Sequence, residues 1–198
     1  MQTNGLYLVR TPILLLATTA LLALLTGCSG GSPLPYALAY EEALERYPGS
    51  ADTDPGAVDQ FVEFFSSDAS HGGDPASLAE NLYADRLYFS DTLLTSQSKA
   101  EVVQHLTRMH EATSSLSVRV LHRQQDGADF YIIWRMTAKF APVSTTITGH
   151  SIGMTHLRFD PEGRIVLQQD FWDASAGFYE HLPVIGFAIR TIQGSFHE

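Results

Sequence analysis

The apolar positions of this chain recur with a helical spacing in its first half and with a strand spacing in its second half. A helix is expected from Ala57, and its apolar face consists of Val58, Phe61, Val62 and Phe65. A short second helix is expected through residues 78–83, followed by a brief strand over residues 86–90. Ser98-Lys-Ala-Glu101 is a capping box. It opens a helix whose buried face is expected to be Val102, Val103, Leu106 and Met109.

From Leu116 onward the apolar residues alternate with polar ones, which is typical of strands. Four strands are expected, over residues 116–124, 130–140, 145–159 and 164–172. Asp126-Gly127 predicts a hairpin between the first two strands, and Pro161-Glu-Gly163 predicts a turn before the last. Helices that precede an antiparallel meander indicate an α+β domain with the helices on one face of the sheet. Residues 174–192 return to a helical spacing.

At the N-terminus, an apolar run from Ile13 to Leu25 follows a head whose only basic side chain is Arg10. A charged head and a short apolar core are typical of a secretory signal, and the run is shorter than the roughly 20 residues of a spanning helix. Leu25-Thr-Gly-Cys28 closes the run and resembles the bacterial lipobox. The resemblance implies a lipoprotein with a signal peptide over residues 1–27 and a lipid on Cys28.

An uncleaved signal anchor, or an ordinary signal followed by a chance cysteine, remains the alternative. Ser29 resembles the pattern of lipoproteins that are sent to an outer membrane. We therefore expect a protein of the bacterial cell envelope, lipid-anchored to a membrane through Cys28 and facing the periplasm in a Gram-negative cell. Residues 28–56, rich in Gly and Pro, are expected to form a tether that includes a weak helix over residues 36–47.

Charge and cysteine content exclude several classes of partner and site. The formal charge is −10 and the basic residues are scattered, so nucleic acid is not expected as a partner. The same acidity means that a membrane contact would come from the lipid rather than from charge. Cys28 is the only cysteine, so neither a disulfide nor a thiolate metal site is expected.

Four segments of the remaining chain carry a family resemblance by their order and spacing. They are residues 82–91 (Leu-Tyr-Ala-Asp-Arg-Leu-Tyr-Phe-Ser-Asp), the helix that Ser98 opens, and residues 157–166 and 169–173. Together they resemble the nuclear transport factor 2-like superfamily, in the branch of SnoaL-like polyketide cyclases, ketosteroid isomerases and limonene epoxide hydrolases. The resemblance implies one cone-shaped α+β domain over residues 57–182, in which a strongly curved antiparallel sheet wraps around the helices and encloses a pocket. Residues 183–198 are left as an apolar tail.

The resemblance also implies roles for two carboxylates. Asp91 matches the position of the proton-shuttling carboxylate of ketosteroid isomerases. Phe61 and Thr155 stand where those enzymes carry the tyrosine and the protonated acid of the oxyanion hole, so steroid isomerisation is not expected. Asp170 matches the acid/base position of the epoxide hydrolases and cyclases. The hydrolases pair that residue with an Arg-x-Asp unit, and here Arg135 is followed by Thr137.

Asp170 and Asp91 are therefore the candidate catalytic pair, if the pocket encloses both. The alternative is that Asp91 caps a turn before Leu93 and that Asp170 pairs with Arg164 or Arg135. The candidate ligand-pocket residues are Tyr88, Trp134 and His150. No metal or organic cofactor is expected. His150 and His156 lie about 20 Å apart along one strand, and His105 and His110 do not share a helix face.

Three functions follow. The first is a pocket that binds a small, mostly apolar ligand without chemistry of its own. The second is a cofactor-free isomerase, cyclase or epoxide hydrolase-like enzyme that uses Asp170 and Asp91. The third is an interaction module in an envelope complex. The apolar tail would cover the pocket, form a homodimer contact or lie on the membrane.

Overall fold

The computed structural model describes residues 35–66, 74–140 and 146–195. The chain divides into two compact units, and the second begins at Tyr40 and contains all the strands. The signal peptide and Cys28 lie outside the described residues. Within the described part of the chain, no helix is both long enough and apolar enough to span a membrane.

Six strands form one mixed sheet in the order β2-β1-β6-β5-β4-β3. The strands are β1 (Tyr83–Ser90), β2 (Thr95–Ser98), β3 (Thr113–Asp126), β4 (Asp129–Phe140), β5 (Ile147–Phe159) and β6 (Ile165–Trp172). All neighbours are antiparallel except β1 and β6, which are parallel. The prediction of a purely antiparallel sheet is therefore wrong for β1 and β6. No hairpin joins β1 to β6, so turn geometry does not set their relative direction.

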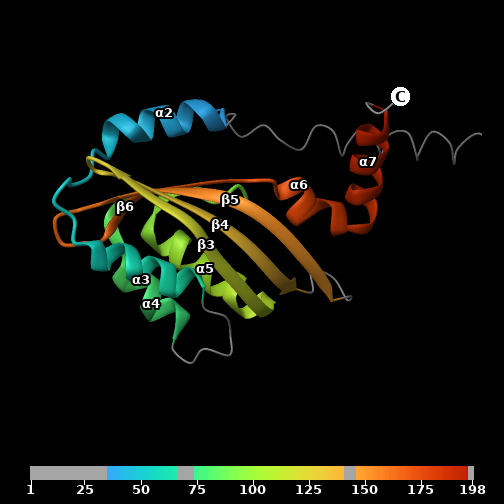
Figure 1. Cartoon of the computed structure of the whole chain (residues 1–198), viewed down its shortest axis with the longest axis horizontal. Helices are drawn as coiled ribbons and strands as arrows, with labels where there is room; N and C mark the ends of the chain where they lie inside the picture. The colour runs from blue at the N-terminus through green and yellow to red at the C-terminus, as the bar shows by residue number, and fades with distance from the viewer. Residues whose placement is uncertain (1–34, 67–73, 141–145, 196–198) are drawn as a thin grey trace, which may run out of the picture. The chain divides into compact units, whose positions relative to one another are not determined.

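Three helices pack on one side of this curved sheet (Figure 1): α3 (Pro55–Phe65), α4 (Pro75–Leu82) and α5 (Lys99–Ala112). Asp54 and Asp74 cap α3 and α4, each just before a proline in the first turn. Ser98 caps α5 by accepting from the amide of Glu101, while the Glu101 carboxylate accepts from Ser96 Oγ at 2.6 Å. The predicted start of α5 after Ser98 is confirmed, although only half of the predicted capping box forms. Helix α3 begins at Pro55 rather than Ala57, and α4 begins at Pro75 and ends at Leu82.

The core lies between these helices and the strands. Its buried members include Phe61 on α3, Val102 on α5, and Ile132, Leu157 and Phe159 on the strands. The predicted α+β fold, with a curved sheet around the helices, is thereby confirmed. The β3–β4 hairpin turns at Gly127, whose φ of 59° is a conformation that glycine adopts without strain.

Residues after Tyr40 belong to the folded unit, although the sequence assigned residues 28–56 to a tether. Helix α2 (Tyr36–Arg46) leads to Tyr47, which is buried. Arg158 on β5 donates to the carbonyls of Leu44 and Tyr47 at 2.7 and 2.9 Å and to Asp129 Oδ1 at 2.5 Å. This guanidinium fastens the end of α2, whose last carbonyls have no helical partners.

His156 completes the contact on the same face of the sheet. Its imidazole lies between the Tyr40 hydroxyl at 2.8 Å and Asp129 Oδ1 at 2.6 Å, and it stacks on Tyr131. Burial lowers the pKa of His156 in spite of the adjacent carboxylate. Burial alone would raise the pKa of Asp129, but the hydrogen bonds from Arg158 and His156 outweigh it and lower that pKa.

The C-terminal segment forms α6 (Ala174–Gly177), a 3-10 turn η1 (Tyr179–His181) and α7 (Pro183–Gly194). Helix α7 is held on η1, because Gly186 approaches the carbonyl of Glu180 and Arg190 donates to the same carbonyl at 2.8 Å. Val184 and Phe187 on α7 are 82% and 70% exposed. The helical spacing predicted for this tail is confirmed, and its apolar side faces outward.

The Arg158 contact predicts a measurable loss of stability. Replacing Arg158 with Lys removes the planar fork that reaches two carbonyls and a carboxylate at once. We expect the free energy of unfolding in urea to fall by about 1–3 kcal/mol, because the carbonyls of Leu44 and Tyr47 and the partly buried carboxylate of Asp129 lose the hydrogen bonds that the guanidinium donates to them together. The matched control is Arg164→Lys in a half-exposed surface ion pair, which should change stability by less than about 0.5 kcal/mol. Equal losses in the two variants would contradict this role for Arg158.

Candidate functional site

A cavity of about 320 Å³ lies between the helices and the inner face of the sheet. Nine aromatic side chains line it: Phe61, Phe64, Phe65, Tyr83, Phe89, Trp134, Phe140, Trp172 and Phe178. Among the described residues, its only carboxylates are Asp91 and Asp170, its one histidine is His110, and neither Lys nor Arg contributes to the wall. The cavity therefore suits a small, mostly apolar molecule.

Strand alternation decides which side chains reach this cavity. On β4 and β6 the even-numbered residues line it, among them Trp134, Met136, Gln168 and Asp170. On β1 the odd-numbered residues do so, and Asp91 follows directly after that strand. Successive side chains of a strand point to opposite faces, so the parallel β1–β6 pair places the two carboxylates on the same side.

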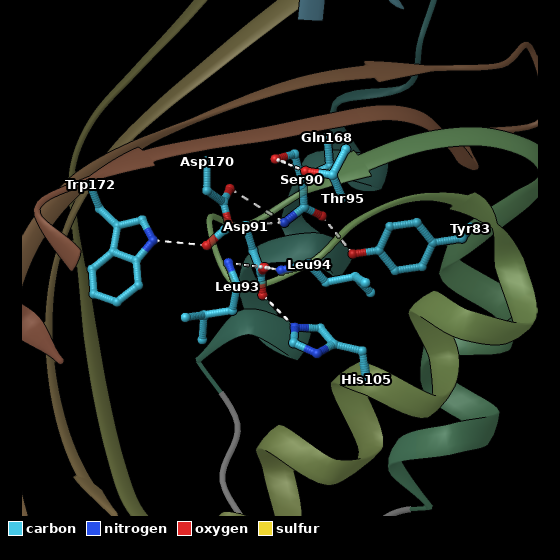
Figure 2. A network of polar contacts seen from close by, with 10 residues as sticks. All are labelled: Tyr83, Ser90, Asp91, Leu93, Leu94, Thr95, His105, Gln168, Asp170 and Trp172. Carbon is cyan, nitrogen blue, oxygen red and sulfur yellow. Dashed lines mark hydrogen bonds and ion pairs between the residues drawn. The ribbon is translucent and has the colours of Figure 1, made fainter. Parts of the chain in front are cut away.

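Asp170 is held by two chains of hydrogen bonds that both start at aromatic donors. Trp134 Nε1 donates to Thr155 Oγ1 at 3.0 Å, and the Thr155 hydroxyl bonds the carboxyl group of Asp170. Tyr83 donates to Gln168 Oε1 at 2.5 Å, and Gln168 Nε2 lies 3.2 and 3.3 Å from the two oxygens of Asp170 (Figure 2). The indole N–H can only donate, so the first chain runs toward Asp170. Both chains orient its carboxyl group.

Burial raises the pKa of Asp170 to about 7, because an apolar surrounding disfavours the charged form. The hydrogen bonds from Thr155 and Gln168 oppose this shift, and the charge of Asp91 adds to it. Burial also raises the pKa of Tyr83, with contributions from Asp170 and Asp91, so Tyr83 remains a neutral donor. Asp170 thus carries a proton for part of the time near neutral pH.

Asp91 has a different, strongly polar environment in the loop between β1 and β2. Its Oδ1 accepts from the amides of Leu93 and Leu94 at 3.0 and 2.8 Å. Its Oδ2 lies 2.6 Å from His105 Nε2, and the indole N–H of Trp172 donates to its backbone carbonyl at 2.9 Å (Figure 2). The carboxylate of Asp91 is therefore held by three nitrogen donors.

The same loop contains the one non-glycine residue with positive φ in the described part of the chain. Thr92 has a φ of 79°, which is costly for a β-branched residue. The contacts of Asp91 on both sides of Thr92 hold the loop in this conformation. Asp91 therefore does cap a turn before Leu93, as the alternative expected, and it lines the cavity as well. Arg164, which that alternative offered as a partner of Asp170, pairs with Asp160 and Glu162.

Of the three predicted pocket residues, Trp134 lines the cavity, and Tyr88 and His150 are not among the lining residues. Tyr88 faces the other side of β1, where its hydroxyl donates to Gln169 at 3.0 Å. His150 is exposed and lies 3.1 Å from Thr137 Oγ1. Its neighbours Gly149 and Ser151 line the cavity instead. The expectation for Tyr88 and His150 is corrected, because both lie in the wrong phase of strand alternation.

The structure also places the residues that differ from the enzymes of the family. Phe61 lines the cavity without a polar group, and buried Thr155 pairs with Asp170 across β5 and β6. A carboxyl group therefore lies one strand away from Thr155. Arg135 and Thr137 are absent from the lining, which takes Trp134, Met136 and Ala138 from the same strand. His105 was considered only as a metal ligand; its spacing from Val102 and Met109 could have placed it on the buried face of α5.

The C-terminal segment closes one side of the cavity. Phe178 stacks on Phe140 of β4, with ring centroids 5.3 Å apart. Gly149 and Gly177 approach so closely that a Cβ on Gly149 would lie 2.4 Å from the Gly177 carbonyl oxygen. Among the described residues, no three His, Cys, Asp or Glu side chains gather in a way that could hold a metal ion.

Comparison with solved structures shows what this fold is similar to. A proposed SnoaL-like polyketide cyclase from Shewanella denitrificans is 18% identical and superposes with a TM-score of 0.51, over 62% of this chain and 94% of that one. A proposed polyketide cyclase from Acidithiobacillus ferrooxidans is 16% identical with a TM-score of 0.51, over 62% and 89%. A protein with a ketosteroid isomerase-like fold from Catenulispora acidiphila, in complex with trimethylamine, is 18% identical with a TM-score of 0.50, over 63% of this chain and 91% of that one. At these identities the likeness shows the fold alone.

No curated protein matches the chain significantly. The family model of the SnoaL-like domain matches residues 56–168, which is more than half of the chain. This range contains α3 apart from Pro55, the helix α5, Asp91 and the strands up to the first half of β6. The chain therefore belongs to the SnoaL-like domain family.

Proposed function

We propose that this protein is an enzyme that moves a proton next to a carbonyl group of a small, uncharged and mostly apolar molecule. The observation that carries the proposal is that Asp91 and Asp170 line one cavity in opposite environments. Two carboxyl groups whose surroundings differ in this way can act as base and acid at the same pH.

In the proposed reaction, Asp91 is the base and Asp170 is the hydrogen-bond donor. The substrate carbonyl oxygen accepts from the protonated carboxyl group of Asp170. Asp91 takes a proton from the adjacent carbon, the C–H electron pair becomes the enolate π bond, and the negative charge on oxygen is stabilised by Asp170. Return of the proton to another carbon gives isomerisation. Attack of the enolate carbon on a second carbonyl group gives cyclisation: the π electron pair of that carbonyl moves to its oxygen, which takes the proton from Asp91.

The wall of the cavity supports this chemistry. Aromatic and aliphatic side chains exclude water, which strengthens the hydrogen bond from Asp170 to a developing oxyanion. The described residues of the lining include neither Lys nor Arg, which favours an uncharged substrate. If the protein transfers no proton, its function is instead to bind a small apolar ligand without chemistry, as the first of the three functions expected from the sequence.

The cell location is a separate proposal. We propose that Cys28 carries the lipid that anchors the protein to a membrane of the cell envelope. The support is the apolar run from Ile13 to Leu25 and the Leu-Thr-Gly sequence before Cys28.

Proton transfer is testable without the natural substrate. β-Tetralone is a small, uncharged aromatic ketone with exchangeable protons beside its carbonyl group. Wild-type protein in D₂O should accelerate deuterium incorporation at these carbons, as followed by NMR. Asp91→Asn should reduce the acceleration by about 10²–10⁴-fold because it removes the base, and Asp170→Asn should reduce kcat because it removes the acid. Unchanged exchange rates in both variants would refute the assignment.

Asp170 also predicts an unusual dependence of stability on pH. Its folded pKa of about 7 lies above the ordinary value of 3.8, so its contribution is fully present below about pH 4 and is lost as the pH rises to about 7. Asp170→Asn should therefore be more stable than wild type at pH 8, by at most about 4 kcal/mol. Chemical denaturation at several pH values measures this difference.

His156 contributes in the opposite sense, because its lowered pKa removes stability as the pH falls below about 6.5. Both proteins contain His156, so the difference between variant and wild type isolates Asp170. A difference that does not change between pH 4 and pH 8 would show that Asp170 has an ordinary pKa.

The anchor predicts a change in fractionation. Cys28→Ser in the full chain removes the sulfur that would carry the lipid, so the protein should lose acylation and leave the membrane fraction. Fractionation of cells that express the two forms, followed by mass spectrometry, measures both effects. A Cys28→Ser protein that stays in the membrane would instead favour the uncleaved signal anchor.

A further inference from the structure

The side chain of His105 contacts Asp91, the proposed base, from outside the cavity. His105 lies on α5 and is not among the residues that line the cavity. Its Nε2 is 2.6 Å from Asp91 Oδ2, and both side chains are largely buried, at 12% and 14% exposure. A carboxylate can only accept, so the shared hydrogen belongs to the imidazole.

The contact fixes the orientation of the Asp91 carboxylate. The amides of Leu93 and Leu94 hold Oδ1 from the loop, while His105 holds Oδ2 from the helix. Two anchors on two different elements prevent rotation of the carboxylate plane. A carboxylate has about four lone-pair positions, and these three donors leave one of them for a proton from a substrate.

The position of His105 is itself well defined. Its ring packs edge-on against Phe89, with centroids 5.9 Å apart. It lies on the same helix face as Val102, which is fully buried in the core. Two other titratable groups face Asp91: its charge helps to raise the pKa of Asp170 on β6 and of Tyr83 on β1. His105 bonds the carboxylate of Asp91 from the helix α5.

We propose that His105 is a positioning residue for the reaction: it holds Asp91 in the orientation in which one carboxylate lone pair faces the cavity. This inference rests on the proposed function, in which Asp91 is the base. It assigns to α5 a catalytic role that neither the lining of the cavity nor the family resemblance indicates. The strained Thr92 loop and α5 together then form the support of the base.

The experiment uses a nitrobenzisoxazole, a planar uncharged probe that needs a base but has no carbonyl group. Removal of its ring C–H proton by Asp91 breaks the N–O bond, and the electron pair ends on the phenolate oxygen of a coloured cyanonitrophenolate. No oxidant, reductant or co-reactant takes part. Steady-state rates in the full-length protein are compared among wild type, His105→Leu, His105→Gln and the control His122→Gln, in which an exposed histidine on β3 is replaced.

We expect His105→Leu to lower kcat by about 10- to 100-fold while KM changes by less than about twofold, because a misplaced base affects the transition state rather than binding. His105→Gln carries its amide nitrogen near the position of Nε2, so it should restore kcat to within about fivefold of wild type. His122→Gln should behave as wild type. Thermal unfolding of each protein shows whether it is folded at the assay temperature.

Three results would overturn the inference. The first is an unchanged kcat in folded His105→Leu. The second is a loss that Gln does not rescue although the Gln variant is folded, since this would indicate a purely structural role. The third is a wild-type protein that is inert toward the probe. Activity toward the nitrobenzisoxazole without deuterium exchange of tetralone would refute the proposed carbonyl chemistry and leave the role of His105 intact.

Discussion

The burial of one carboxyl group in an apolar cavity is the constraint on which the site depends. Asp170 is 5% exposed and lies among aromatic side chains, where an ionised carboxylate is disfavoured. Two chains of hydrogen bonds, from Trp134 and Tyr83, partly offset the free-energy cost of burying the carboxyl group. These bonds orient the group without restoring its ordinary acidity. A carboxyl group that destabilises the folded state at neutral pH is typical of a functional site.

Asp91, the other carboxylate of the cavity, has polar surroundings. It leaves the strand at the start of a tight loop, and the loop offers it two amides and an imidazole. The strained φ of Thr92 is tolerated because these contacts hold the backbone on both sides. The proposed acid and base thus differ in the elements that surround them. Asp170 lies on a strand, whereas Asp91 lies in a loop that a helix supports.

Local patterns in the sequence were sufficient for the elements and for part of the site. The spacing of Phe61 and Val58, the turn at Gly127 and the alternation from Leu116 gave α3, the hairpin and the meander. The same alternation could not say which phase faces inward, so Tyr88 and His150 were expected in the cavity although their odd-numbered neighbours line it.

Other features required contacts between distant parts of the chain. The parallel pairing of β1 with β6 and the contact of His105 with Asp91 arise only when the helices and the sheet pack together. The docking of the segment after Tyr40 depends on Arg158, more than one hundred residues away in sequence. Composition alone made that segment resemble a linker, because its Pro and Gly residues are equally common in loops that are packed on a domain.

The central claim is that Asp170 keeps a proton near neutral pH while it lines an apolar cavity. The most direct measurement is the carboxyl ¹³C chemical shift of Asp170 as a function of pH, assigned by comparison with Asp170→Asn. We expect the titration of this chemical shift to have its midpoint near pH 7, in agreement with the raised pKa of about 7. A midpoint near the ordinary aspartate value of about 4 would mean that Asp170 is ionised at neutral pH, and it would contradict the proposed division between acid and base.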